Sequence, residues 1–235
     1  MRNSLLFADE TKRRSFFLLV AFSLFCFSLT VARCIYTGRR MFLFLDWNLF
    51  LAGLPWIVST LLVLHPGKKN KGIFSWLAII TWLLFFPNAP YMITDLFHLR
   101  TATDSPKWFD LMLVFSFAWT GIIAGFLSLR DIEQLLHSRL RGKFVRAVIG
   151  IMLFASGFGI YLGRYLRQNS WDMLSGSQNI FHEIAQRFLH PQVHPRTWGM
   201  TLLFGIFLNL AYWSVGLFGN AKPAQKEIST GTVEQ

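Results

Sequence analysis

Six long apolar stretches alternate with short polar connections along this chain of 235 residues. A helix of roughly 20 apolar residues crosses a hydrocarbon core about 30 Å thick, so stretches of this length predict membrane-spanning helices. The pattern therefore predicts an all-α fold, a polytopic membrane helix bundle of about six transmembrane helices in one transmembrane domain over residues 15–218. The predicted spans lie near residues 15–31, 47–64, 73–91, 108–129, 145–162 and 198–218.

The connections and chain ends give further expectations. Residues 1–14 are predicted to be a cytoplasmic N-terminus, and the polar residues 219–235 a disordered cytoplasmic tail. The basic connection 130–146 predicts a short amphipathic helix on the inner leaflet. Residues 180–189 carry apolar side chains at helical spacing, which predicts a helix on the outer surface.

Composition supports a membrane environment and excludes a nucleic-acid partner. Hydrophobic residues make up 53% of the chain, charged residues only 15%, and the mean hydropathy is +0.42. Soluble domains carry about 25% charged residues. The net charge of +11 lies in short connections between apolar segments, where it sets topology and attracts anionic headgroups. The expected partners are the lipid bilayer and either a lipid headgroup or a membrane protein.

The basic residues also predict an orientation. Grouping alternate connections places 14 Lys and Arg on the face that holds both termini and 9 on the opposite face. Cytoplasmic loops are enriched in Lys and Arg, so both termini are expected in the cytoplasm.

With this orientation, four helix ends carry polar residues at one depth on the outer side, whereas the inner ends carry mainly Lys and Arg. We expect these polar residues to form one cluster, in which acids and guanidinium groups neutralise each other. Its members are Asp46, Asn48, Asn88, Tyr91, Thr94, Asp95, His98, Asp110, Tyr161, Arg164, Arg167, Asn169, Ser170 and Asp172.

Two roles are open for this cluster. A carboxylate or histidine could act as a general base, which makes Asp95, His98, Asp110 and Asp172 the catalytic candidates. Guanidinium and amide groups could hold a phosphate or carboxylate, which makes Asn88, Tyr91, Arg164, Arg167 and Asn169 the substrate-binding candidates. The same residues could equally be a structural clamp. The isolated D-x-x-H spacing of Asp95 and His98 is too weak to predict a metal, and no cofactor is expected.

The segment Pro87-Asn88-Ala89-Pro90 interrupts the third apolar stretch near its outer end. Proline removes a backbone hydrogen bond, so the segment is either a broken helix whose backbone lines a polar pocket or the plain end of a span. Gly121 and Gly125, and likewise Gly159 and Gly163, are four residues apart, which predicts close helix packing.

Several strings in the chain resemble those of a known family. "NLFLAGLPW", "LLFFPNAPYMITDLFHL", "WFD" and "GFGIYLGRYLRQNSWD" are similar to the hallmarks of domain of unknown function 1361, a family of small bacterial multi-pass membrane proteins. The resemblance covers approximately residues 46–172 and is looser in the last span. It implies a multi-pass protein of the bacterial cytoplasmic (inner) membrane, and it implies no activity.

Three functions remain open. The favoured one is an envelope accessory protein that binds a lipid or a partner protein through the polar cluster. The alternatives are an intramembrane enzyme acting on a lipid-linked, phosphorylated substrate, and a small transporter gated at the broken helix. The sequence lacks a P-loop, H-E-x-x-H, G-x-S-x-G and C-x-x-C, which argues against a nucleotide-driven machine. No predicted span carries a charged residue in its middle, which argues against an ion-coupled transporter.

Overall fold

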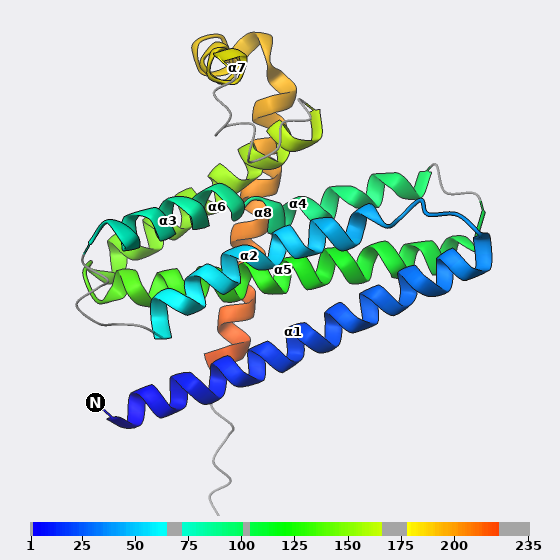
Figure 1. Cartoon of the computed structure of the whole chain (residues 1–235). Helices are drawn as coiled ribbons and strands as arrows, with labels where there is room; N and C mark the ends of the chain where they lie inside the picture. The colour runs from blue at the N-terminus through cyan, green and yellow to red at the C-terminus, as the bar shows by residue number, and fades with distance from the viewer. Residues whose placement is uncertain (1, 65–71, 101–103, 166–177, 221–235) are drawn as a thin grey trace, which may run out of the picture.

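The computed structural model describes residues 2–64, 72–100, 104–165 and 178–220, and all regular elements in these ranges are helical (Figure 1). Six helices are long and apolar enough to cross a membrane, so the predicted all-α fold with six candidate spans is confirmed. The elements are α1 (Arg2–Thr37), α2 (Phe44–Leu64), α3 (Ile73–Phe85), α4 (Asn88–Tyr91), η2 (Met92–Arg100), α5 (Lys107–His137), α6 (Gly142–Tyr165), α7 (Gln178–Leu189), η3 (Pro191–Val193) and α8 (Pro195–Asn220), where η marks a 3₁₀ helix.

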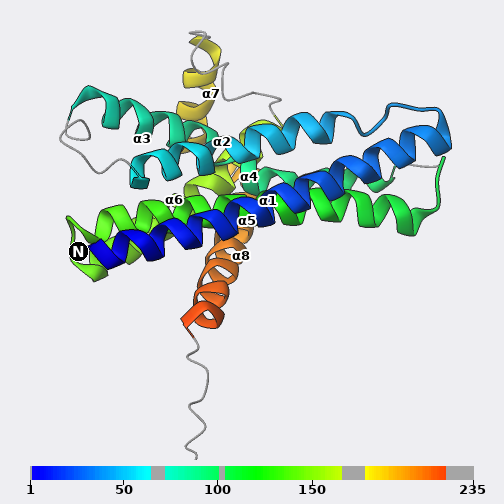
Figure 2. The same cartoon turned by 60° about the horizontal axis from the view of Figure 1, so that its bottom comes forward.

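The helices α1, α2 and α5 lie side by side, and α3 packs against α2 (Figures 1 and 2). Helix α8 crosses the direction of these helices steeply in both views and packs mainly against α6. We call the end of the bundle at which α1 ends and α2 and α5 begin the Asp95 end. The opposite end, at which α2 and α5 finish, is called the Asp131 end.

The third predicted span does not stop at its prolines. The chain breaks after α3 and then continues as α4 and η2, so the candidate span runs from Ser75 to Arg100. We call the segment from Phe86 to Pro90 the break. Ala89 within it and Met92 just after it are fully buried. The interpretation of a plain helix end is therefore wrong. This segment enters the bundle.

The backbone groups released by the prolines find partners close by. The Asn88 side-chain amide donates to the Phe85 carbonyl at 3.0 Å, and the Ala89 N–H donates to the Phe86 carbonyl at 3.2 Å. The Tyr91 N–H donates to the Pro87 carbonyl at 3.0 Å. A backbone group left unpaired in hydrocarbon costs several kcal/mol, so these bonds allow the break to exist inside the membrane.

Glycines from two helices make room for the broken segment. A Cβ built on Gly121 of α5 would lie 2.7 Å from Met92 Sδ and 2.9 Å from the Ala89 carbonyl oxygen. A Cβ on Gly159 of α6 would lie 2.8 Å from Pro87 Cβ. At Gly121 and Gly159 the close packing predicted from the small-residue motifs is present, and the segment that approaches both glycines is the break.

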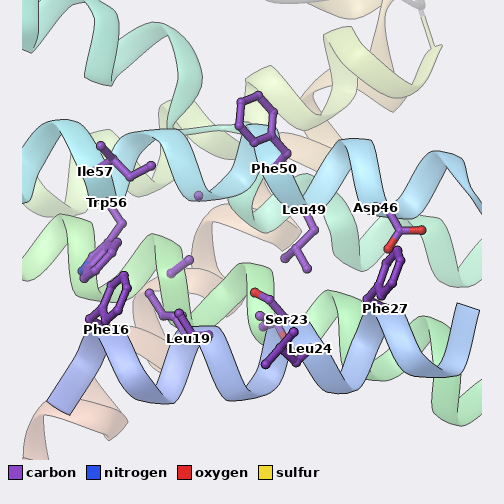
Figure 3. A pocket seen from close by; sticks show the side chains of 14 residues that line it. Phe16, Leu19, Ser23, Leu24, Phe27, Asp46, Leu49, Phe50, Trp56 and Ile57 are labelled. Carbon is purple, nitrogen blue, oxygen red and sulfur yellow. The ribbon is translucent and has the colours of Figure 1, made fainter. Parts of the chain in front are cut away.

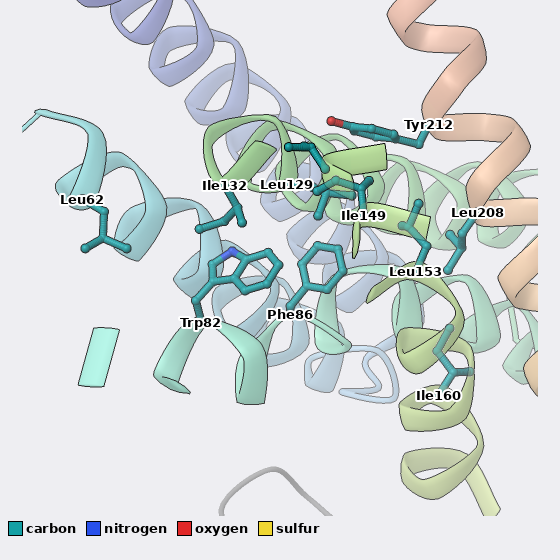
Figure 4. Packing of buried hydrophobic residues seen from close by; sticks show 11 residues of the cluster. Leu62, Trp82, Phe86, Leu129, Ile132, Ile149, Leu153, Ile160, Leu208 and Tyr212 are labelled. Carbon is teal, nitrogen blue, oxygen red and sulfur yellow. The ribbon is translucent and has the colours of Figure 1, made fainter. Parts of the chain in front are cut away.

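The core behind the break joins α3 to α5, α6 and α8 (Figure 4). Trp82 stacks on Phe86 with ring centroids 4.6 Å apart, and its indole N–H donates to Ser128 Oγ at 3.2 Å. Ile149 and Leu208 are fully buried in the same cluster. The aromatic pair fixes α3 just before the chain turns.

The connection 130–146 differs from its prediction. Helix α5 continues without interruption to His137, and α6 begins at Gly142, so no separate amphipathic helix forms there. Asp131, which belongs to this connection, is buried and forms an ion pair with Lys12 of α1. Ser59 Oγ of α2 donates to the same carboxylate at 2.8 Å. Because these side chains pair across α1, α2 and α5, the packed bundle includes this part of α5 beyond residue 129, where the predicted span ends.

The N-terminal segment and the last connection also contain helix. Helix α1 starts at Arg2, so the N-terminal segment is continuous with the first span, and residues 221–235 lie outside the described part. The helix predicted for residues 180–189 is present as α7. Its Phe188 ring packs against Trp198 of α8 at 5.2 Å and Phe158 of α6 at 5.5 Å. These contacts seat α7 on α6 and α8.

Replacement of Gly121 by alanine tests the packing of the break. The added methyl group would collide with a backbone carbonyl, so we expect Gly121→Ala to lower stability by about 1–3 kcal/mol. Gly199→Ala is the matched control, because a Cβ there meets nothing within 4 Å and alanine favours helix by up to about 1 kcal/mol. Thermal unfolding in detergent, followed by tryptophan fluorescence, measures both; equal midpoints would contradict the close approach.

Candidate functional site

The structure divides the predicted polar cluster into separate groups. Asp46 and Asn48 are two residues apart on α2, so their side chains leave the helix about 200° apart. Asn48 faces η2, where it contacts Asp95, whereas Asp46 faces α1. The expectation of one continuous cluster is therefore wrong, although those of its members that the structure describes lie towards one end of the bundle.

The first group, which we call the Asp95 cluster, contains Asn48, Asp95, His98 and Arg164 from three elements. Asp95 is buried, and the Asn48 amide donates to its Oδ2 at 3.1 Å. Arg164 Nη1, at the end of α6, lies 3.7 Å from Asp95 Oδ1. The predicted pairing of Asp95 with Arg164 is thus present in the structure.

Arg164 is the cationic member of the Asp95 cluster, and its side chain is partly exposed. Its Nη1 lies 3.2 Å from His98 Nε2, and its guanidinium carbon lies 5.4 Å from the centre of the Phe97 ring. Because a guanidinium only donates, Nε2 of His98 accepts this bond and the imidazole is neutral. The Arg164 side chain keeps a fifth of its surface exposed. Further N–H groups of the guanidinium can therefore bind an anion that approaches from outside.

The second group is a buried ion pair that sequence reasoning missed. Arg33 of α1 donates from Nε to Asp110 Oδ1 at 2.7 Å and from Nη2 to Asp110 Oδ2 at 3.3 Å. Both side chains are 1% exposed, and the guanidinium lies 4.4 Å from the centre of the Phe42 ring. In the sequence, Arg33 is one of the nine basic residues on the face opposite the termini, and it indicates orientation only. Its place at the end of a long apolar stretch indicates in addition that it needs a partner. Asp110 is therefore engaged with Arg33 and is a structural residue in this arrangement.

Asp46 stands apart from both groups. It lines a cavity between α1 and α2, and its Oδ2 has no hydrogen-bond partner among the described residues.

The other candidates stabilise local structure or lie outside the described residues. Asn88 caps the broken helix, Tyr91 packs beside the core behind the break, and Thr94 Oγ1 donates to the Tyr91 carbonyl at 2.8 Å. Tyr161 stacks on Tyr165 with centroids 5.3 Å apart. Four predicted members fall outside the described part, namely Arg167, Asn169, Ser170 and Asp172.

The arrangement offers little for a metal ion. In the described ranges no three His, Cys, Asp or Glu side chains gather in a way that could hold one. Asp95 and His98 both contact Arg164, and a fixed positive charge beside them repels a cation.

The fold and these polar groups define a polytopic membrane protein of helix-bundle type. The sequence model of the family described as "Protein of unknown function (DUF1361)" matches residues 47–211, and the chain belongs to that family. The match extends past the residues on which the resemblance was based and includes most of α8. No curated protein and no solved structure matches the chain.

The buried ion pair predicts a non-additive response to mutation. Asp110→Asn leaves the Arg33 guanidinium without its countercharge, which we expect to cost roughly 3–5 kcal/mol of stability. The double replacement Arg33→Met with Asp110→Leu removes both charges. It should be far less harmful than Arg33→Met alone or Asp110→Leu alone. Unfolding in detergent and the amount of inserted protein measure these effects. A double variant as unstable as the sum of its parts would exclude the coupling.

Proposed function

We propose that this chain is an integral membrane protein that binds the anionic headgroup of a lipid or lipid-linked molecule at the Asp95 cluster. The observation that carries the proposal is the state of Arg164. Its guanidinium is held from behind by buried Asp95 and by His98, while part of the side chain stays open. A preorganised guanidinium loses little rotamer freedom when it binds a phosphate or carboxylate.

The position of Arg164 along the helices supports a headgroup as the ligand. The candidate span of α6 ends at Tyr165, and the span that contains η2 ends at Arg100. Arg164 and His98 are therefore one and two residues from the ends of their spans. Lipid phosphates lie at this boundary between hydrocarbon and water. The exposed Phe97 ring beside Arg164 is available to lie against the adjoining hydrocarbon.

The enzyme alternative receives less support from this geometry. A general base must be within hydrogen-bond reach of the substrate. Asp95 is 1% exposed, with one oxygen bonded to Asn48 and the other facing Arg164. The accepting nitrogen of His98 is directed at Arg164 as well. Neither group presents a free lone pair to a lipid-linked substrate in this arrangement.

The transporter alternative required a gate at the broken helix. The break is packed against Gly121, Gly125 and Gly159, each of which would place a Cβ under 3 Å from it. Dense packing of this kind argues for a fixed structural joint. An accessory role is also compatible with this site, because a partner protein that carries a carboxylate could bind the Arg164 guanidinium in the same way as a lipid headgroup.

The first test compares Arg164→Gln with Arg39→Gln. Arg39 is an exposed arginine that pairs with Asp104 at 2.8 Å, so the two variants lose the same charge at different places. Native mass spectrometry with phosphatidylglycerol should show binding to Arg164→Gln weakened about tenfold, the size of one lost hydrogen bond between charged groups. Arg39→Gln should bind like the unmodified protein. Equal weakening of both variants would reduce the effect to net charge and contradict a site.

The second test separates a binding site from an active site. Asp95→Asn keeps the shape of the side chain but removes the negative charge next to Arg164. We expect phosphatidylglycerol to bind this variant more tightly, because the guanidinium no longer has an internal counter-ion. Loss of binding in a folded and inserted Asp95→Asn protein would show that the carboxylate itself contacts the ligand, and that result would favour the enzyme alternative.

A further inference from the structure

A groove lies between α1 and α2 (Figure 3). Asp46 lines it, whereas Asn48, which contacts Asp95, leaves α2 about 200° from Asp46, so the groove and the Asp95 cluster lie on different faces of α2. It has a volume of about 510 Å³, and Thr120 and Ala124 of α5 contribute to its lining. Its walls are almost entirely apolar. Phe27 and Asp46 lie at one end of the groove, and Phe16 stacks on Trp56 at the other with centroids 6.4 Å apart (Figure 3).

The groove opens to the lipid-facing side of the bundle. Leu24, Phe50 and Ile57 line it and are 64%, 54% and 46% exposed. Gly53 lines its middle, and a Cβ placed there would meet nothing within 4 Å. The described side chains therefore leave this space open, and a hydrocarbon chain from the surrounding bilayer can enter it from the side.

The length of the groove fits one leaflet. Its lining on α2 extends from Asp46 to Ile57, and the eleven steps between these two residues rise roughly 16 Å at about 1.5 Å per step. Half of a hydrocarbon core about 30 Å thick is about 15 Å. Asp46 lies in the first turn of α2, at the Asp95 end of the bundle. A lipid of the leaflet at that end would place its headgroup beside Asp46 and its chain along the groove.

The charge at the mouth selects the headgroup. Asp46 has no cationic partner among the residues that the structure describes. Thr30 of α1 hydrogen-bonds to its carboxylate, and its Oδ2, which is buried, accepts no hydrogen bond there. The nearby arginine on α1, Arg33, is committed to Asp110. An ionised carboxylate next to an apolar groove is costly unless a cation or hydrogen-bond donors reach it. A lipid ammonium group supplies both.

We propose that the groove between α1 and α2 binds an aminophospholipid, with its ammonium group at Asp46 and one acyl chain along Phe27, Gly53 and Phe16. This site differs in charge preference from the Asp95 cluster, where Arg164 selects an anion. It does not depend on that proposal, because the two sites use different faces of α2.

Photo-crosslinking in nanodiscs tests the groove directly. The probe is phosphatidylethanolamine with a diazirine midway along one acyl chain, compared with phosphatidylglycerol that carries the same chain. We expect phosphatidylethanolamine to label peptides that contain residues 16–27 and 49–57 about tenfold more than phosphatidylglycerol does, the size expected for a hydrogen bond between charged groups. Equal labelling by the two lipids would reduce the groove to ordinary bilayer contact and overturn the proposal.

Two variants separate the roles of the chain and of the headgroup. Gly53→Leu fills the groove without a backbone collision and should abolish the labelling of these peptides, whereas Gly199→Leu, at a second open glycine on α8, should leave it unchanged. Asp46→Asn should remove the preference for phosphatidylethanolamine while labelling by the acyl chain persists. Undiminished labelling of Gly53→Leu, or a preference that survives in Asp46→Asn, would overturn the site.

Arg164→Gln keeps the two proposals distinguishable. It should not alter labelling of the groove, because Arg164 lies against Asp95 and His98 beyond α2. Loss of groove labelling in this variant would contradict an independent site.

Discussion

The break between Phe86 and Pro90 is the constraint on which the arrangement of polar groups depends. A helix that continued straight through residue 95 would point Asp95 in another direction, because each residue advances the helix by about 100°. The two prolines make the turn possible, and Asn88 satisfies a carbonyl that the helix releases. Gly121 and Gly159 allow α5 and α6 to approach the turn closely enough to hold it in one position. Asp95 can therefore meet Asn48 and Arg164 because Pro87 and Pro90 turn the chain and because Gly121 and Gly159 leave room for the turn.

Charge pairing governs the remaining positions in the bundle. Arg33 with Asp110, and Lys12 with Asp131, each connect α1 to α5, and the two pairs lie near opposite ends of α1. A buried charge without its partner is strongly destabilising, so these two pairs fix the axial position of α1 against α5 more tightly than apolar contacts do. Helix α1 is otherwise largely lipid-facing, with many exposed apolar side chains. The pairs thus explain how a mostly lipid-facing helix keeps a defined place.

The sequence is sufficient to predict where the helices lie along the chain. It is not sufficient to predict which face of each helix meets its neighbours. Apolar length predicted the six spans, and the spacing of Gly121 and Gly125 predicted a close approach, since both are properties of one segment. The prediction of a single polar cluster is wrong because it rests only on the depth of the residues in the membrane. The helical phase of Asp46 and Asn48 already places them on opposite faces. The prediction of a separate helix over residues 130–146 does not include the buried pairing of Asp131, whose partner Lys12 is 119 positions away in the chain. Such long-range pairing cannot be read from local periodicity.

Helix α2 links the two proposed sites and also keeps them apart. It presents Asn48 to the Asp95 cluster and Asp46 to the groove, so it would separate the proposed anion site from the proposed aminophospholipid site. A helix with its side chains is about 10–12 Å across, which is too thick for one headgroup to reach around. The two sites would therefore hold two lipids of different charge at similar depth. Each proposed lipid would contact a different face of α2, so loss of one leaves the contacts of the other in place. Binding at both sites would hold α2 from two sides, against α1 and against η2, and each lipid would add its own contribution to the stability of the bundle.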